Sequence, residues 1–120
     1  RLLDLDADVA AAGLERARGL RPSPLYRAAD AERIATGGLD ALPDAARGSD
    51  WLIEAVIERL EPKRELFGRL DEALADRAAA DWPLVSTNTS GIPVAALAEG
   101  RSDAFRAAFL GTHFFNPPRY

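Results

Sequence analysis

The sequence has 120 residues and a formal net charge of −4, with 48% hydrophobic and 28% charged residues, no cysteine and one histidine. This length accommodates one small domain with its core, and the lack of cysteine excludes disulfides and thiolate metal sites. Acidic and basic residues are interleaved without the basic stripe that nucleic-acid binding requires. A single histidine without a paired carboxylate motif predicts no metal site.

The sequence also lacks the signals of membrane and secreted proteins. No stretch approaches the roughly 18 apolar residues that span a bilayer, and the N-terminus has neither the basic nor the apolar region of a secretory signal. We therefore expect a cytoplasmic protein that binds neither nucleic acid nor membranes. Because the chain lacks any methionine and begins with residues typical of a strand interior, we expect a segment cut at both ends.

The first part of the chain predicts short strands and helices joined by irregular segments. Asp8 is expected to cap the first helix, and Gly37-Gly38 are expected to end the second strand. The expected elements are a strand at residues 2–5, a helix to about Gly19, an irregular proline-rich segment at 21–24, a short helix at 28–34 and a weak strand at 34–36.

The second part carries the clearest periodicity. Residues 51–57 form a nearly continuous apolar run, which predicts a strand buried on both faces. Pro62 sits in the first turn of a helix that extends to about Ala80, with an apolar stripe down one side. The other expected elements are a turn or brief helix at 39–46, a strand at 83–86, helices at 93–98 and 103–109, and a strand at 110–114.

This alternation of strands and helices predicts an α/β fold with a mostly parallel sheet and right-handed crossovers. Ligands of such sheets bind beyond the carboxyl ends of the strands. Polar residues follow the expected strands at those ends, namely Asp4, Glu58, residues 88–90 and residues 113–116. We therefore expect a nucleotide-binding face there.

Each polar residue also has a structural interpretation. Asp4 is placed to accept hydrogen bonds from a ribose, which favours NAD over NADP because a carboxylate repels a 2′-phosphate. Asp6 is a rival for that role, and both carboxylates are also suited to capping the next helix. Glu58 and Lys63 form either a solvated pair at a helix start or part of a cofactor groove beside Ala55.

The other candidates follow the fourth and fifth expected strands. Asn88 and Ser90 are common turn residues, and a single histidine is often a packed one. At the end of a strand opposite a serine-bearing strand end, however, His113 is suited to proton transfer, because its ordinary pKa lies near 6.5. Asn116 is stiffened by the two prolines that follow it.

These stretches, in this order, resemble the NAD-binding domain of the 3-hydroxyacyl-CoA dehydrogenases of fatty-acid β-oxidation. The resemblance rests on residues 50–58, 63–67, the Ser-x-Asn-Thr-Ser turn at 86–90 and the His-Phe-Phe-Asn-Pro block at 113–117. The insert at 21–26 resembles the long bacterial branch, in which this domain is joined to an enoyl-CoA hydratase-like domain. The resemblance implies a Rossmann-type doubly wound sheet.

The resemblance also implies an activity and its residues. An L-3-hydroxyacyl-CoA is oxidised to the 3-ketoacyl-CoA with hydride transfer to NAD. His113 is then the general base, Ser90 hydrogen-bonds the substrate oxygen, and Asn116 lies where substrate and nicotinamide meet. The implied cofactor-binding residues are Asp4, Ala55, Glu58, Lys63, Asn88, Ser90 and Asn116.

Relative to that family, residues 1–120 form a partial Rossmann domain. The first strand with its glycine-rich loop, the glutamate that orients the histidine, and the C-terminal helical dimerisation domain are absent. We therefore expect this segment alone to be unstable and inactive, since removal of a central strand leaves open sheet edges. We expect the full-length protein to form a homodimer or a multienzyme complex. Two alternatives remain: a dehydrogenase of a small 3-hydroxy acid, and a non-catalytic protein that retains the cofactor fold.

Overall fold

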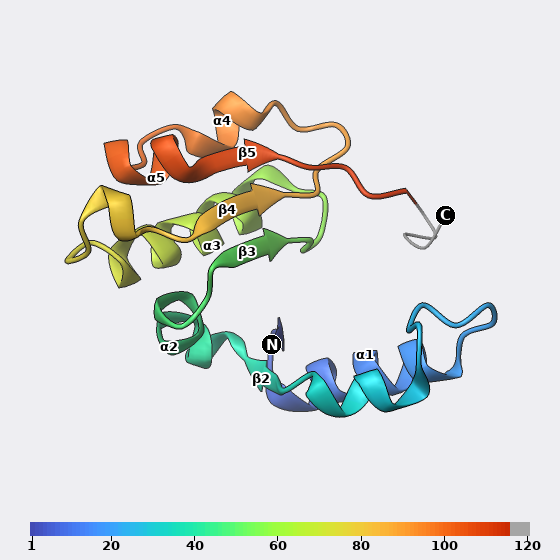
Figure 1. The fold of residues 1–120 in the computed structure, drawn as a ribbon. Helices are drawn as coiled ribbons and strands as arrows, with labels where there is room; N and C mark the ends of the chain where they lie inside the picture. The colour runs from blue at the N-terminus through green and yellow to red at the C-terminus, as the bar shows by residue number, and fades with distance from the viewer. Residues whose placement is uncertain (116–120) are drawn as a thin grey trace. The chain divides into compact units, whose positions relative to one another are not determined.

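A computed structural model describes residues 1–115, which form two compact units (Figure 1). The first unit contains residues 1–42 and residue 115, and the second contains residues 43–114. Within the described residues, no helix has the length and apolar character that crossing a membrane requires. Asn116, an expected site residue, lies outside the described residues.

The first unit is a parallel strand pair with helical connections. Its β1 and β2 are hydrogen-bonded in parallel, with Leu3 opposite Gly37, and α1 packs against both strands. Its elements are β1 (Leu2–Asp4), α1 (Ala7–Gly19), a 3₁₀ helix (Ala28–Arg33), β2 (Thr36–Gly38) and a second 3₁₀ helix (Leu39–Ala41). The residues between Leu20 and Arg27 contain no helix or strand, as their prolines predict.

The start of α1 corrects the expected cap. Asp6, rather than Asp8, is the N-cap residue, and its side chain accepts a hydrogen bond from the Val9 N–H at 2.8 Å. Asp6 has an extended backbone, with φ −145° and ψ 173°, which aims its carboxylate at the free amides of the first turn. Asp8 is already inside that turn, where its charge favours the positive end of the helix.

The position of β2 was also predicted incorrectly. The strand covers Thr36–Gly38, so the two glycines form part of the strand instead of ending it. A Cβ atom at Gly38 would lie 3.2 Å from the Cα of Asp6 and 3.4 Å from the amide nitrogen of Ala7. The glycine therefore allows the start of α1 to approach the strand backbone closely.

The second unit is a three-stranded parallel sheet of order β3-β4-β5. The parallel pairing confirms the predicted α/β fold class. Its elements are α2 (Leu42–Arg47, whose first residue belongs to the first unit), β3 (Trp51–Glu54), α3 (Leu60–Ala73), a 3₁₀ helix (Ala79–Asp81), β4 (Leu84–Thr87), α4 (Val94–Ala98), α5 (Asp103–Ala108) and β5 (Phe109–Gly111).

Several of these elements are shorter than predicted, among them β5, which covers Phe109–Gly111 rather than residues 110–114. Helix α3 ends at Ala73 rather than near Ala80, since after the buried Leu74 no large apolar residue follows up to Ala80 to hold another turn on the core. Strand β3 ends at Glu54 rather than Ile57. There the Val56 N–H donates to the Glu54 carboxylate at 2.6 Å instead of to a neighbouring strand.

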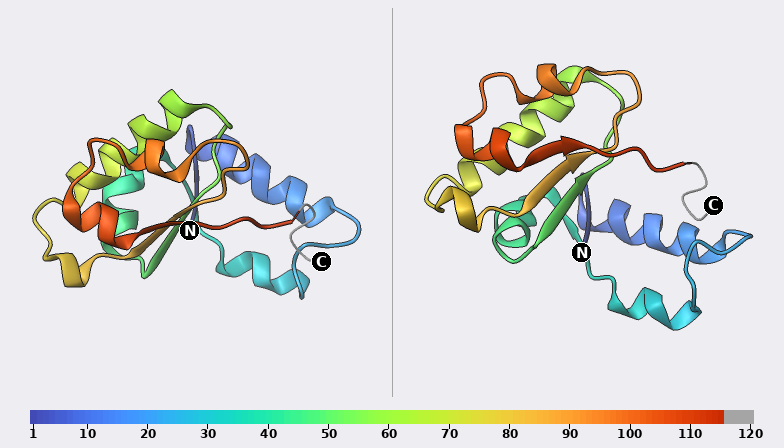
Figure 2. Two further views of the ribbon diagram at one scale, coloured as in Figure 1. Left: turned by 90° about the horizontal axis from the view of Figure 1, so that it is seen from above. Right: turned by 45° about the horizontal axis from the view of Figure 1, so that its top comes forward.

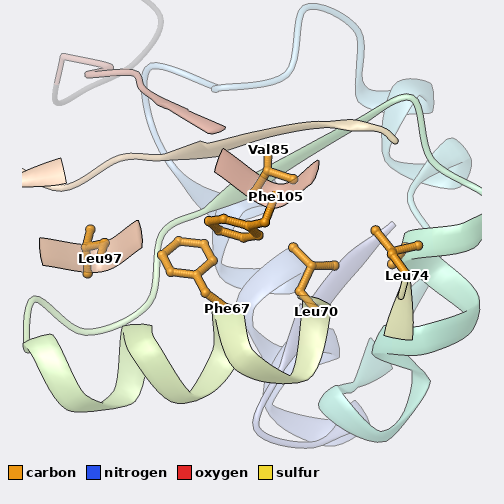
Figure 3. Close-up of a cluster of buried hydrophobic side chains, with 7 residues drawn as sticks. Phe67, Leu70, Leu74, Val85, Leu97 and Phe105 are labelled. Atoms are coloured by element: carbon orange, nitrogen blue, oxygen red, sulfur yellow. The ribbon is translucent and has the colours of Figure 1, made fainter. Parts of the chain in front are cut away.

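The core of the second unit lies between one face of the sheet and its helices (Figure 3). Phe67 of α3 and Phe105 of α5 pack edge to face, with ring centroids 5.5 Å apart. The other buried apolar members of the cluster are Ala46, Leu70, Leu74, Val85 and Leu97. This arrangement confirms the apolar stripe predicted along the helix.

The expected burial of β3 on both faces was wrong. Trp51 is 46% and Ile53 47% exposed, whereas Leu52 packs against the core and Glu54 is buried. Alternate residues of a strand point to opposite faces, so only one face of β3 faces the core of this unit. An apolar run therefore records the composition of both faces but not what covers each of them.

Replacing Gly38 with alanine tests the close approach of α1 to β2. Because the new methyl group would meet backbone atoms of Asp6 and Ala7, we expect the full-length protein to lose about 1–3 kcal/mol of unfolding free energy. Urea unfolding measures this loss. Gly19→Ala is the matched control, since a Cβ there would meet nothing within 4 Å. Equal stabilities of the two variants would contradict the packing described.

Candidate active site

The candidate site lies at the carboxyl end of the sheet in the second unit. Strands β3, β4 and β5 are parallel neighbours, so the segments that follow them leave the sheet at the same edge (Figures 1 and 2). These segments are residues 55–58, 88–91 and 112–114. They contain five of the predicted site residues, Ala55, Glu58, Asn88, Ser90 and His113.

Lys63, in the first turn of α3, is buried beneath this edge. Its side chain is 1% exposed, and its Nζ lies 2.7 Å from Oε1 of Glu54 and 3.2 Å from Oε2 of Glu58. It also donates to the carbonyl oxygen of Val56 at 3.3 Å. A buried ammonium group needs such partners to offset its lost hydration. The interpretation of Lys63 as one half of a solvated pair was therefore wrong.

Glu54 is a site residue that the sequence analysis missed. Its buried carboxylate accepts hydrogen bonds from Lys63 Nζ at 2.7 Å, the Val56 N–H at 2.6 Å and the Thr87 hydroxyl at 2.5 Å. It therefore connects the ends of β3 and β4 to α3. The available signal was an acidic residue at an inward position of an otherwise apolar strand, where a charge is rare unless it is paired.

Glu58 holds the segment that contains Ser90. Its Oε1 accepts hydrogen bonds from the Thr89 hydroxyl at 2.6 Å, the Ser90 N–H at 2.8 Å and the Gly91 N–H at 2.9 Å. The Thr89 hydroxyl first, then the Gly91 and Ser90 amides and Lys63, lower the pKa of Glu58 from 4.5 to about 2. The carboxylate is therefore ionised at neutral pH.

The segments that carry Ser90 and His113 lie side by side. The Asn88 side-chain oxygen accepts a hydrogen bond from the Phe114 N–H at 2.8 Å, and the Thr112 N–H donates to the Thr87 carbonyl at 2.9 Å. Nδ1 of His113 lies 3.5 Å from the carbonyl oxygen of Thr89, the residue before Ser90. The imidazole and the serine are both exposed, as access to a substrate requires.

The role of Nδ1 in this contact depends on the tautomer of the imidazole. A carbonyl oxygen only accepts hydrogen bonds, so Nδ1 is a donor to Thr89 in the tautomer with the proton on Nδ1. In that tautomer, Nε2 carries the lone pair and is able to act as a base.

Asp4 belongs to the first unit and is the last residue of β1. Its carboxylate is exposed and accepts the N–H of the next residue, Leu5, at 2.8 Å. Because Asp6 caps α1, the capping interpretation does not apply to Asp4, whereas the carboxylate of Asp6 is engaged by the helix. Each of the two carboxylates thus accepts one backbone N–H, from Leu5 for Asp4 and from Val9 for Asp6.

Comparison with known families assigns the chain. Residues 2–120 match the family described as 3-hydroxyacyl-CoA dehydrogenase, NAD binding domain. The chain belongs to this family. The predicted cofactor class, NAD, and the predicted resemblance are thereby confirmed.

Similar curated proteins carry related names. The chain is 47% identical over 100 residues to a probable 3-hydroxyacyl-CoA dehydrogenase of Bacillus subtilis, a match that covers 83% of the chain and 12% of that protein. It is 38% identical over 112 residues to a probable 3-hydroxyacyl-CoA dehydrogenase of Deinococcus radiodurans, covering 93% of the chain and 31% of that protein. The chain thus spans less than a third of the length of these two relatives.

A solved structure has the same fold. The 3-hydroxybutyryl-CoA dehydrogenase of Escherichia coli K12 matches with a TM-score of 0.70 and 26% identity, over 97% of this chain and 24% of that one. The Rossmann-type fold predicted from the sequence is therefore confirmed.

The lowered pKa of Glu58 predicts an acid-dependent loss of stability. A carboxylate whose pKa is lower in the folded state stabilises it fully above about pH 4.5, and that contribution is lost as the pH falls toward about 2. Glu58→Gln removes the titrating group. The difference in unfolding free energy between wild type and this variant should be constant near neutral pH and should shrink across that acidic range.

Urea unfolding of the full-length protein at a series of pH values measures this difference. Glu99→Gln, at a surface carboxylate that pairs with Arg64, controls for the loss of one negative charge. A difference for Glu58→Gln that stays the same down to about pH 2 would contradict the hydrogen bonding described for the loop.

Proposed function

We propose that the protein containing this chain is an NAD-dependent dehydrogenase that oxidises an L-3-hydroxyacyl-CoA to the 3-ketoacyl-CoA in fatty-acid β-oxidation. The observation that carries the proposal is the juxtaposition of the His113 and Ser90 segments at one sheet edge, with His113 Nδ1 3.5 Å from the Thr89 carbonyl. Membership of the NAD-binding family supports it.

The chemistry of the exposed groups fits a dinucleotide. Asp4 has carboxylate oxygens available for two ribose hydroxyls, and Ala55 after β3 is exposed and small enough to let a ring approach. Glu58, Lys63 and Asn88 remain predicted cofactor contacts, although Lys63 already has three acceptors around its ammonium group. Bound NAD supplies the acceptor for the hydride that leaves the carbinol carbon.

The residues of this chain supply the proton chemistry. In the proposed reaction, Nε2 of His113 takes the proton of the substrate hydroxyl as the carbinol carbon becomes a carbonyl carbon. The Ser90 hydroxyl donates a hydrogen bond to the same oxygen and orients it. Asn116 is proposed to lie where substrate and nicotinamide meet.

The names of the relatives support the acyl-CoA substrate and the assembly. One protein of Rickettsia felis, 34% identical over 100 residues that cover 83% of the chain and 13% of that protein, is named a putative fatty acid oxidation complex trifunctional enzyme. We accordingly propose that the full-length protein acts as part of a multienzyme complex. The cytoplasmic location and the alternative homodimer stay predictions from the sequence.

Replacing His113 with glutamine in the full-length protein tests the proposed base. We expect kcat for 3-hydroxybutyryl-CoA to fall by about 10²- to 10⁴-fold, because glutamine cannot accept the proton. Ser90→Ala should lower kcat by about ten- to a hundredfold through loss of one oriented donor. Initial rates of NADH formation measure both effects.

Two outcomes would favour the alternatives. Faster oxidation of free 3-hydroxybutyrate than of the CoA ester would indicate a dehydrogenase of small hydroxy acids. Unchanged rates in His113→Gln would remove the imidazole from the mechanism, and an absence of NADH binding by fluorescence would indicate a non-catalytic protein.

A further inference from the structure

We propose that Glu58 is a positioning residue that holds the Ser90 hydroxyl in its productive place, a role separate from any cofactor contact. This inference rests on the proposed function, because it gives Ser90 its part in that reaction. Two observations support it: three hydrogen bonds converge on the Glu58 carboxylate, and this carboxylate pairs with the buried Lys63.

The first observation is the convergence of donors from consecutive residues. Oε1 of Glu58 lies 2.6 Å from the Thr89 hydroxyl, 2.8 Å from the Ser90 amide nitrogen and 2.9 Å from the Gly91 amide nitrogen. The Thr89 hydroxyl in turn accepts the Ile92 N–H at 3.2 Å. Successive amides that face one anion fix the backbone of the segment, and with it the direction of the Ser90 side chain.

The second observation is that Glu58 is itself held from below. Its Oε2 lies 3.2 Å from Nζ of Lys63, which is buried and lies 2.7 Å from Glu54. Glu54 also accepts the Thr87 hydroxyl, at 2.5 Å. These contacts form one continuous network. It links Thr87, at the end of β4, through the side chains of Glu54, Lys63 and Glu58 to the loop that directly follows β4.

This geometry separates positioning from cofactor binding. Oε1 already receives three donors from the loop, whereas Oε2 receives one from Lys63. The two oxygens of a carboxylate have about four lone-pair sites together, so Oε1 is fully used by the loop, and a further donor from a ligand would go to Oε2. Loss of the Oε1 contacts should therefore disturb Ser90 even where cofactor affinity is unchanged.

The test is a double-mutant cycle in the full-length protein, with Glu58→Ala, Ser90→Ala and the double variant. We expect Glu58→Ala to lower kcat by about ten- to a hundredfold, as small misplacements in an active site do, beyond any change in KM for NAD that its predicted cofactor contact brings. In the Ser90→Ala background, the same replacement should change kcat by less than about threefold, since the hydroxyl that Glu58 positions is gone.

Matched variants make the test specific. Glu58→Gln retains an oxygen for the three loop donors and should keep more activity than Glu58→Ala. Thr89→Val removes one of those donors with little change of shape, so it tests the same loop if Glu58→Ala does not fold. Its smaller loss of kcat should also vanish in the Ser90→Ala background. Glu99→Ala, which removes an exposed carboxylate paired with Arg64, should leave kcat unchanged.

The outcomes separate the two proposals. If Glu58→Ala or Thr89→Val lowers kcat by the same factor with and without the Ser90 hydroxyl, or changes only KM for NAD, the positioning role is overturned. If Ser90→Ala alone leaves kcat unchanged, the proposed role of Ser90 fails first, and the positioning role fails with it.

Discussion

The candidate site is built on one buried ammonium group. Lys63 is 1% exposed and lies between the carboxylates of Glu54 and Glu58. Buried ion pairs contribute little net stability, because desolvation of the charges offsets their attraction, but removal of one partner leaves an unpaired buried charge. These two ion pairs therefore restrict the geometry around Lys63, because both carboxylates must stay within reach of Nζ. Glu54 in turn holds the end of β4, and Glu58 holds the loop that follows it.

The polar edge and the apolar core share the same elements. Helix α3 carries Lys63 in its first turn and Phe67 one turn later. The packing of Phe67 against Phe105 and Phe109 therefore also determines the position of the Lys63 ammonium group relative to the sheet edge. Thr87, at the end of β4, is buried, and its hydroxyl donates a hydrogen bond to the Glu54 carboxylate. The residues proposed for chemistry thus extend from a rigid frame, as precise placement of reactive groups requires.

The sequence predicted the order of elements and the edge at which the polar residues gather, because these follow from periodicity and from the parallel topology. It did not predict that Glu54 and Lys63 pair in the interior. Periodicity identified the strand and the helix but not the partners of their polar residues, because the pairing of Glu54 with Lys63 depends on a contact between β3 and α3. Gly38 was misjudged for a similar reason: a glycine that ends a strand and one that lets a helix approach closely have the same local sequence.

We propose that His113 and Ser90 act on one oxygen while Glu58 holds the loop between β4 and α4. A crystal structure of the full-length protein with NAD and a 3-ketoacyl-CoA tests it most directly. Nε2 of His113 and the Ser90 hydroxyl should lie within about 3.2 Å of the substrate carbonyl oxygen, and Glu58 should still accept hydrogen bonds from the Thr89 hydroxyl and the Ser90 and Gly91 amides. An imidazole turned away from the substrate, or a loop detached from Glu58 in that complex, would contradict it.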